Sequence, residues 1–182
     1  MMRFRLAAWC VAAAGLGAGL IAGCDRKATQ SAAAPATAPV ILPAGLFLGG
    51  APADAKDIKD SKGSLKAGDK VVLRGKIGGS VEPFIAGRAM FTIVDTRMKS
   101  CDQTEEMPGC KTPWDYCCDD PSDIAANAAT VRVEDAGGQV LKTGLDGVNG
   151  LKPLAVVTVV GTVAQAEGPN LVVRAEGIFV NR

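Results

Sequence analysis

The chain has 182 residues and no histidine, and its formal charge at neutral pH is +1. The absence of histidine excludes Ser-His-Asp hydrolysis, Cys-His catalysis and histidine-ligated haem or zinc. A charge near zero also argues against a broad phosphate-binding surface, which usually carries an excess of Lys and Arg.

The first residues have the pattern of an export signal. Arg3 and Arg5 precede an apolar run without acidic residues, which is typical of a secretory signal peptide. The run ends at residues 20–24, LIAGC, which resemble the lipobox of bacterial lipoproteins. The resemblance implies cleavage before Cys24, a lipid on its thiol, and an extracytoplasmic protein anchored to a membrane of the cell envelope. The alternatives are an ordinary signal peptide cut near Ala22 and a retained anchor helix.

Three segments follow from this interpretation. Residues 1–23 form the predicted lipoprotein signal peptide. Residues 24–45, rich in Ala and Pro, cannot bury enough apolar surface to fold alone and are predicted to be a tether. Residues 46–182 are long enough for one domain with its own core.

Strand patterns dominate this domain. Aromatic residues make up only 4% of the chain, while Val and Gly are plentiful, and this composition favours an all-β fold. Alternation of apolar and polar residues predicts strands within 68–79, 89–97 and 130–141. Residues 154–180 predict a hairpin of two long strands, with a turn at 167–170 where Gly, Pro and Asn cluster.

The order of these segments resembles the OB-fold, a small five-stranded Greek-key barrel. The resemblance covers about residues 68–181 and rests on three motifs in this order: V-x-x-R-G-x-I, F-T-I-x-D and V-x-V-x-G-x-V. It implies that the first and fourth strands coil at Gly75 and Gly161. Another small barrel or a sandwich is the alternative.

Two polar segments are candidates for short helices, 53–66 and 121–129. In the second, Ser122 is placed to cap the helix and Asp123 to lie in its first turn. Irregular loop is the alternative for both segments.

Residues 98–129 interrupt the expected barrel between its second and third strands. They contain four of the six cysteines, Cys101, Cys110, Cys117 and Cys118, and cysteines of an oxidising compartment commonly form disulfides. A bridge between the adjacent residues 117 and 118 would be strained. We therefore predict two disulfides, either Cys101–Cys117 with Cys110–Cys118 or Cys101–Cys118 with Cys110–Cys117.

The same four cysteines could instead bind a metal or form a redox centre. The gaps between them are eight, six and no residues, which do not match the knuckles of structural zinc sites. No pair has the two-residue spacing of dithiol exchangers. The spacing therefore favours disulfides over both alternatives.

A binding surface has two sets of candidates. Trp114 and Tyr116, in the insert, either pack over the insert as a small core or form a recognition surface, where such residues are enriched. OB-folds often bind ligands along their second and third strands, and five basic residues are candidates for such a face, or else belong to a solvated sheet surface: Arg74, Lys76, Arg88, Arg97 and Arg132.

The sequence thus predicts a lipid-anchored, extracytoplasmic OB-like module that binds a ligand or has a structural role. No phosphate-cradling glycine loop occurs in the predicted domain, so an enzyme is disfavoured and no cofactor is expected. The expected partners are the membrane, through the lipid, and another envelope protein, a peptide or a glycan. The alternatives are an envelope metal or cofactor carrier that uses the Cys and Asp residues of the insert, and a nucleic-acid-binding OB domain, although nucleic acid is an unlikely partner outside the cytoplasm.

Overall fold

The computed structural model describes residues 41–104 and 109–181, which belong to one compact unit, Thr37–Arg182. The expected signal peptide, Cys24 and most of the expected tether lie outside the described residues. Within the described ranges, none of the helices is long and apolar enough to cross a bilayer.

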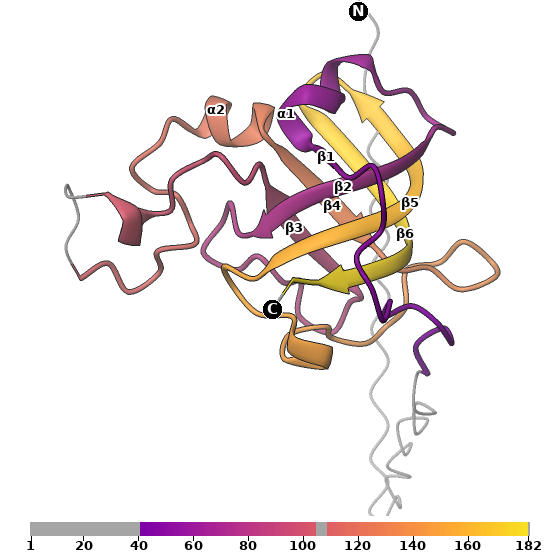
Figure 1. Ribbon diagram of the computed structural model, residues 1–182. Helices are drawn as coiled ribbons and strands as arrows, with labels where there is room; N and C mark the ends of the chain where they lie inside the picture. Colours follow the sequence, from indigo (N-terminus) through magenta and orange to yellow (C-terminus); the bar gives the residue numbers. More distant parts are fainter. Residues whose placement is uncertain (1–40, 105–108, 182) are drawn as a thin grey trace, which may run out of the picture. The chain divides into compact units, whose positions relative to one another are not determined.

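The described chain consists mainly of strands, with a few short helices in the connections between them (Figure 1). The strands are β1 (Lys56–Asp57), β2 (Lys70–Ile77), β3 (Met90–Val94), β4 (Ala128–Arg132), β5 (Val156–Glu167) and β6 (Asn170–Val180). The α-helices are α1 (Ile58–Ser61) and α2 (Pro121–Ala126), and the 3-10 helices are η1 (Lys62–Ser64), η2 (Cys101–Gln103) and η3 (Val148–Gly150).

Five of the strands close into a barrel in the order β2, β3, β4, β6, β5, because β5 pairs with β2 along residues 156–162. Neighbouring strands are antiparallel, except that β4 and β6 run parallel. β1 adds a short parallel pairing to β2 outside the ring. The expected small five-stranded OB-like Greek-key barrel is therefore confirmed.

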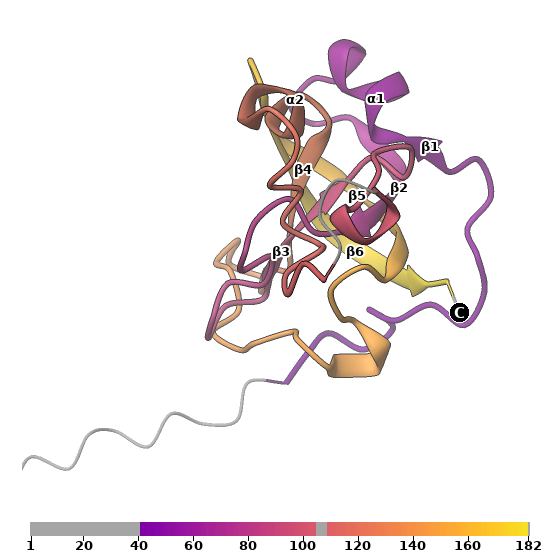
Figure 2. The same ribbon diagram turned by 90° about the vertical axis from the view of Figure 1, so that its left-hand side faces the viewer.

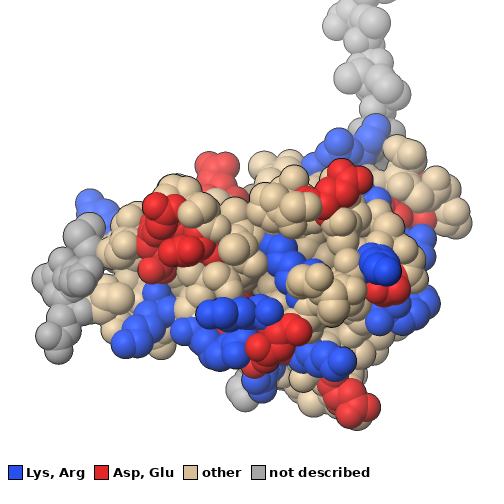
Figure 3. Space-filling model, turned by 90° about the horizontal axis from the view of Figure 1, so that it is seen from above, with Lys and Arg blue, Asp and Glu red and all other residues tan. Residues whose placement is uncertain are grey.

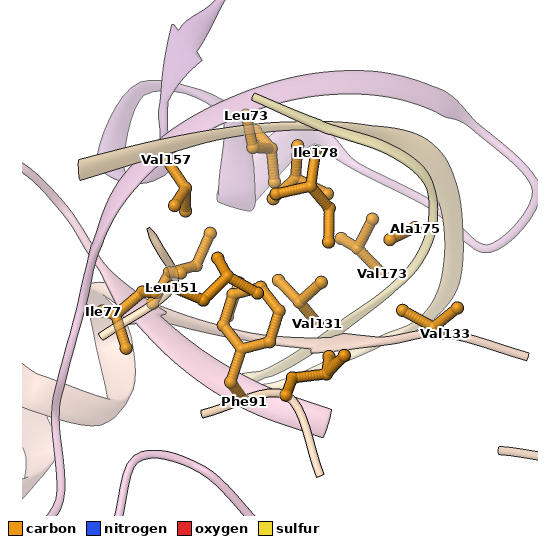
Figure 4. Close-up of a cluster of buried hydrophobic side chains, with 14 of the residues drawn as sticks. Leu73, Ile77, Phe91, Val131, Val133, Leu151, Val157, Val173, Ala175 and Ile178 are labelled. Carbon is orange, nitrogen blue, oxygen red and sulfur yellow. The ribbon is translucent and has the colours of Figure 1, made fainter. Parts of the chain in front are cut away.

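The barrel strands turn alternate side chains into one shared interior (Figure 4). Leu73, Phe91, Val131, Val157 and Val173 are each at most 1% exposed. Burial of each such side chain contributes about 1.5–3 kcal/mol. The cluster that they form draws on the strands and on loops outside the insert, so the barrel has a core that does not depend on the cysteines.

Two glycines lie where the barrel strands approach most closely. A Cβ at Gly75 would lie 3.0 Å from the Cβ of Ile93, and a Cβ at Gly161 would overlap the carbonyl oxygen of Arg174. The register between β5 and β6 shifts at Gly161. Both positions therefore need glycine where the strands coil, as the OB resemblance implied.

The short helices differ in detail from the expectation. α1 and η1 occupy only part of the segment 53–66. α2 lies within 121–129, but its N-cap is Asp120, whose carboxylate accepts a hydrogen bond from the Ser122 N–H at 2.8 Å. The assignment of Ser122 as the cap was wrong, because Pro121 already occupies the first helical position, where proline is favoured.

The insert connects β3 to β4, as expected from the sequence. It projects from one side of the barrel in Figure 1 and faces the viewer in Figure 2. Val94 at the end of β3 pairs with Ala128 at the start of β4. The chain therefore leaves and re-enters the sheet at the same level of the ladder.

Candidate metal centre in the insert

The insert is fixed to the barrel through the connection that follows β2. The Gly79 N–H donates a hydrogen bond to the carbonyl oxygen of Trp114 at 2.8 Å. The indole Nε1 of Trp114 donates to the carbonyl oxygen of Val81 at 3.0 Å. Residues 110–118 are thereby held against the barrel at their middle.

The side chain of Tyr116, which belongs to this loop, packs between the loop and the barrel. It is fully buried, and its ring lies so close to Gly78 that a Cβ there would be 2.9 Å from Cε2. Tyr116 therefore belongs to a small core and not to an exposed recognition surface. Trp114 is half-buried, with its indole engaged by the barrel, so the structure does not present the two aromatic residues as one exposed pair.

The backbone of Tyr116 is in the left-handed region, with φ of 59°. Non-glycine residues adopt this conformation at a cost of about 1–3 kcal/mol and often do so at functional sites. Tyr116 lies between Asp115 and Cys117 in the chain, and the side chains of these two neighbours both lie close to Cys101.

Cys101 is the centre of the cysteine cluster. It lies in η2 and is only 1% exposed. The helix is held by a capping box between Ser100 and Gln103, and Lys76 of β2 donates a hydrogen bond to Gln103 Oε1 at 3.3 Å. The buried sulfur is therefore placed by contacts with the barrel.

The other thiols gather around Cys101. Its Sγ lies 3.7 Å from the Sγ of Cys117 and 3.7 Å from the Sγ of Cys118. Ligand atoms of four residues lie within 4.8 Å of one another: Cys101, Cys110, Asp115 and Cys117. Thiolates at about 2.3 Å from a tetrahedral ion would be separated by about 3.8 Å. The spacing fits a shared cation.

The two disulfides expected from the sequence are not formed in this structure. All four cysteines are free, and the 3.7 Å separations far exceed the S–S bond length of about 2.05 Å. Cys101 is approached equally by Cys117 and Cys118, whereas a disulfide would select one of them. The arrangement is that of a cluster and not of two pairs.

Asp115 adds a carboxylate to the cluster. Burial opposes its ionisation, but hydrogen bonds from the Cys117 N–H and the Thr112 hydroxyl, at 2.9 and 2.8 Å, hold the pKa of Asp115 below its usual range. Asp115 and Thr112 were not singled out from the sequence among the acidic and polar residues of the insert. The signal was present in the spacing Asp-Tyr-Cys, because an Asp carboxylate commonly accepts a hydrogen bond from the backbone N–H two residues further on.

Crowding of acceptors opposes deprotonation of the thiols. Hydrogen bonding with Cys101 and with Asp115 raises the pKa of Cys117 to about 12. Hydrogen bonding with Cys101, together with burial, also raises the pKa of Cys118. A cation at the centre of the cluster would reverse this effect, because it stabilises the thiolates.

Cys118 also faces open space. It lies on the wall of a cleft of about 900 Å³. The other residues that line the cleft are Arg97, Met98, Lys99, Gln103, Thr104 and Asp119. The cluster is therefore buried at Cys101 and accessible at Cys118.

The five basic candidates do not form a free binding face. Arg74 pairs with Asp57 at 3.1 Å, Arg97 with Asp95 at 2.9 Å and Arg132 with Glu134, while Arg88 is exposed. Lys76 is nearly buried and reaches the insert. Figure 3 shows basic and acidic side chains interspersed on one face. A surface of this kind offers little to a polyanion.

Asp95 links this region to α1. Its carboxylate accepts hydrogen bonds from the Lys59 N–H at 2.7 Å and from Arg97 at 2.9 Å. It is 1% exposed and lies directly after β3. The start of the insert is therefore anchored to α1 by a buried, paired charge.

Comparisons of the chain with protein-family models, with curated proteins and with solved structures found no match. A function must therefore be argued from the cluster and from the barrel that holds it. A fold alone does not define a function, whereas the donor atoms of the cluster limit the kinds of ligand that it can bind.

Proposed function

We propose that this protein is a lipid-anchored, extracytoplasmic, non-enzymatic OB-barrel module that binds a thiophilic metal cation in its insert. The proposed ligands are Cys101, Cys110, Cys117 and Asp115. The observation that carries the proposal is the convergence of their four donor atoms within 4.8 Å of one another. The sulfur spacing of 3.7 Å between Cys101 and Cys117 supports it.

The donor set selects the class of cation. Thiolates favour soft ions such as Cu(I), Zn²⁺ and the irons of iron–sulfur clusters, whereas Ca²⁺ and Mg²⁺ require mostly oxygen ligands. Each cysteine that binds loses its proton to water. The bound cation offsets the mutual repulsion of the thiolates and the Asp115 carboxylate.

The barrel serves as the rigid support for this site. Its hydrophobic cluster contains none of the four cysteines, so the barrel does not need the metal in order to fold. A small zinc-dependent domain, in contrast, is unfolded without its ion. Metal binding is therefore proposed as the function of the module and not as a requirement for its folding.

Elemental analysis tests the metal proposal directly. The protein is purified from membranes in detergent, without chelators, and its metal content is measured per chain. We expect about one equivalent of a soft metal and its loss in Cys101→Ser. Because Cys101 is buried, Cys110→Ser is the second variant, and far-UV circular dichroism checks that both fold. Protein free of metal with two disulfides, established by mass spectrometry before and after reduction, would contradict the proposal.

The anchoring part of the proposal rests on the lipobox resemblance at residues 20–24. Cys24→Ser removes the thiol that would carry the lipid. We expect intact mass spectrometry of the wild-type protein from membranes to show a chain that begins at Cys24 and carries acyl chains, and the variant to carry none. A wild-type mass equal to that of the uncleaved chain without acyl chains would favour a retained anchor helix.

A further inference from the structure

We propose that the cation is monovalent copper and that it reaches the cluster through the cleft at Cys118, with Cys118 and the thioether of Met98 as successive soft ligands. This inference rests on the proposed metal-binding function and names its ion and its route. It concerns residues outside the proposed set of four ligands, so it can fail while metal binding itself stands.

The buried centre of the cluster meets the outside through exposed thiols. Cys101 is 1% exposed, whereas Cys117 and Cys118 are exposed, and of these two Cys118 lines the cleft of about 900 Å³. Release of a metal directly from the buried Cys101 thiolate into water would leave an uncompensated charge behind. A fourth thiol at the surface avoids that intermediate, because the ion is never without a sulfur ligand.

The distances provide for such a transfer. Cys101 Sγ is 3.7 Å from the sulfurs of both Cys117 and Cys118. An ion held by Cys101 and Cys118 can therefore pass to Cys101 and Cys117 while its bond to Cys101 is kept. The bond to Cys118 breaks as the bond to Cys117 forms. Cys117 gives its proton to water and Cys118 takes one up, so charge and oxidation state are unchanged.

Met98 indicates which ion uses this route. Its side chain lines the same cleft as Cys118. A thioether is neutral and soft, and among the metals that thiolates bind it serves as a ligand chiefly for copper. A zinc site gains little from a neutral sulfur at its opening, and zinc sites with thiolates are usually closed and tetrahedral. A cleft that is lined by both a thioether residue and a thiol suits Cu(I).

The test measures transfer of copper from the protein. The full-length protein in detergent is loaded anaerobically with one equivalent of Cu(I), and the absorbance of the Cu(I) complex of bathocuproine disulfonate is followed after mixing. We expect Cys118→Ser to retain bound Cu(I) at equilibrium but to release it at least about tenfold more slowly, on the scale of losing a metal-site partner. Met98→Leu is expected to slow release by a smaller factor, and Met90→Leu, outside the cleft, is the matched control.

Three results would overturn the inference. Equal release rates for the wild type and Cys118→Ser would remove the relay. Loss of stoichiometric copper from Cys118→Ser would make Cys118 an ordinary ligand of the site. Wild-type protein that binds Zn²⁺ but not Cu(I) would exclude the ion while leaving the proposed metal-binding function intact, whereas protein that binds neither ion would refute the proposed function itself.

Discussion

Gly78, directly after β2, is a point of close contact between the insert and the barrel. A Cβ at this position would lie 2.6 Å from the carbonyl oxygen of Trp114, the same oxygen that accepts the hydrogen bond from Gly79. Gly78→Ala must therefore push the insert away from the barrel. We expect the docking of the insert to weaken by about 1–3 kcal/mol, which is the usual cost of overpacking.

The free energy lost from the docking of the insert should also be lost from the free energy of metal binding. Binding would have to restore the docked loop that positions Asp115 and Cys117, so 1–3 kcal/mol corresponds to about a 5- to 150-fold loss of affinity. Competition with a chromogenic chelator measures this loss. The emission of Trp114 should move to longer wavelength as its indole becomes exposed, while the far-UV circular dichroism of the barrel should not change.

Gly63→Ala is the matched control, because a Cβ at Gly63 meets no atom within 4 Å. This variant should bind the metal as the wild type does and keep the emission of Trp114. If the two variants have the same affinity and the same emission, the insert is not positioned through Gly78 and the reasoning is refuted.

Three further predictions concern stability and binding. Burial alone would raise the pKa of Asp95, but hydrogen bonds, chiefly from Arg97, lower it to about 2, so its contribution of about 2 kcal/mol is present above pH of about 4 and is lost as the pH falls through about 2. Asp95→Asn should therefore flatten the acid side of the stability curve measured by urea unfolding, and an unchanged slope would count against this assignment. Asp115→Asn should lower metal affinity by about 10- to 100-fold in chelator competition, and wild-type affinity would exclude the carboxylate as a ligand. Gly161→Ala should destabilise the barrel by more than about 1 kcal/mol because its Cβ overlaps the facing backbone, while Gly144→Ala, in open space, should not differ from the wild type in urea.

The barrel could be predicted from the sequence because its signals are local. Alternation around Leu73 places apolar side chains on one face, and the glycines at 75 and 161 mark the coils. The turn at 167–170 fixes the register of the last hairpin. Each of these features operates within a few residues, so the pattern along the chain is sufficient.

The cluster could not be predicted because it depends on contacts that are distant in sequence. The adjacency of Cys117 and Cys118 argued against a shared centre, and only the left-handed backbone of Tyr116 and the docking of Trp114 bring the surrounding donors to Cys101. Among the basic residues, the pairing of Arg74 with Asp57 of β1 is likewise a contact between separate elements. Arg97 and Arg132, in contrast, pair with acids only two residues away, Asp95 and Glu134, and alternation alone did not reveal these pairs.

The pairing of Val94 with Ala128 has an implication for the history and engineering of this protein. Residues that face each other on adjacent strands are only about 5 Å apart, so a two-residue turn can join β3 directly to β4. The insert thus takes the place of the short turn that would otherwise join β3 and β4 as a hairpin. It can be gained, lost or transplanted to another hairpin without a change in the order of the barrel strands.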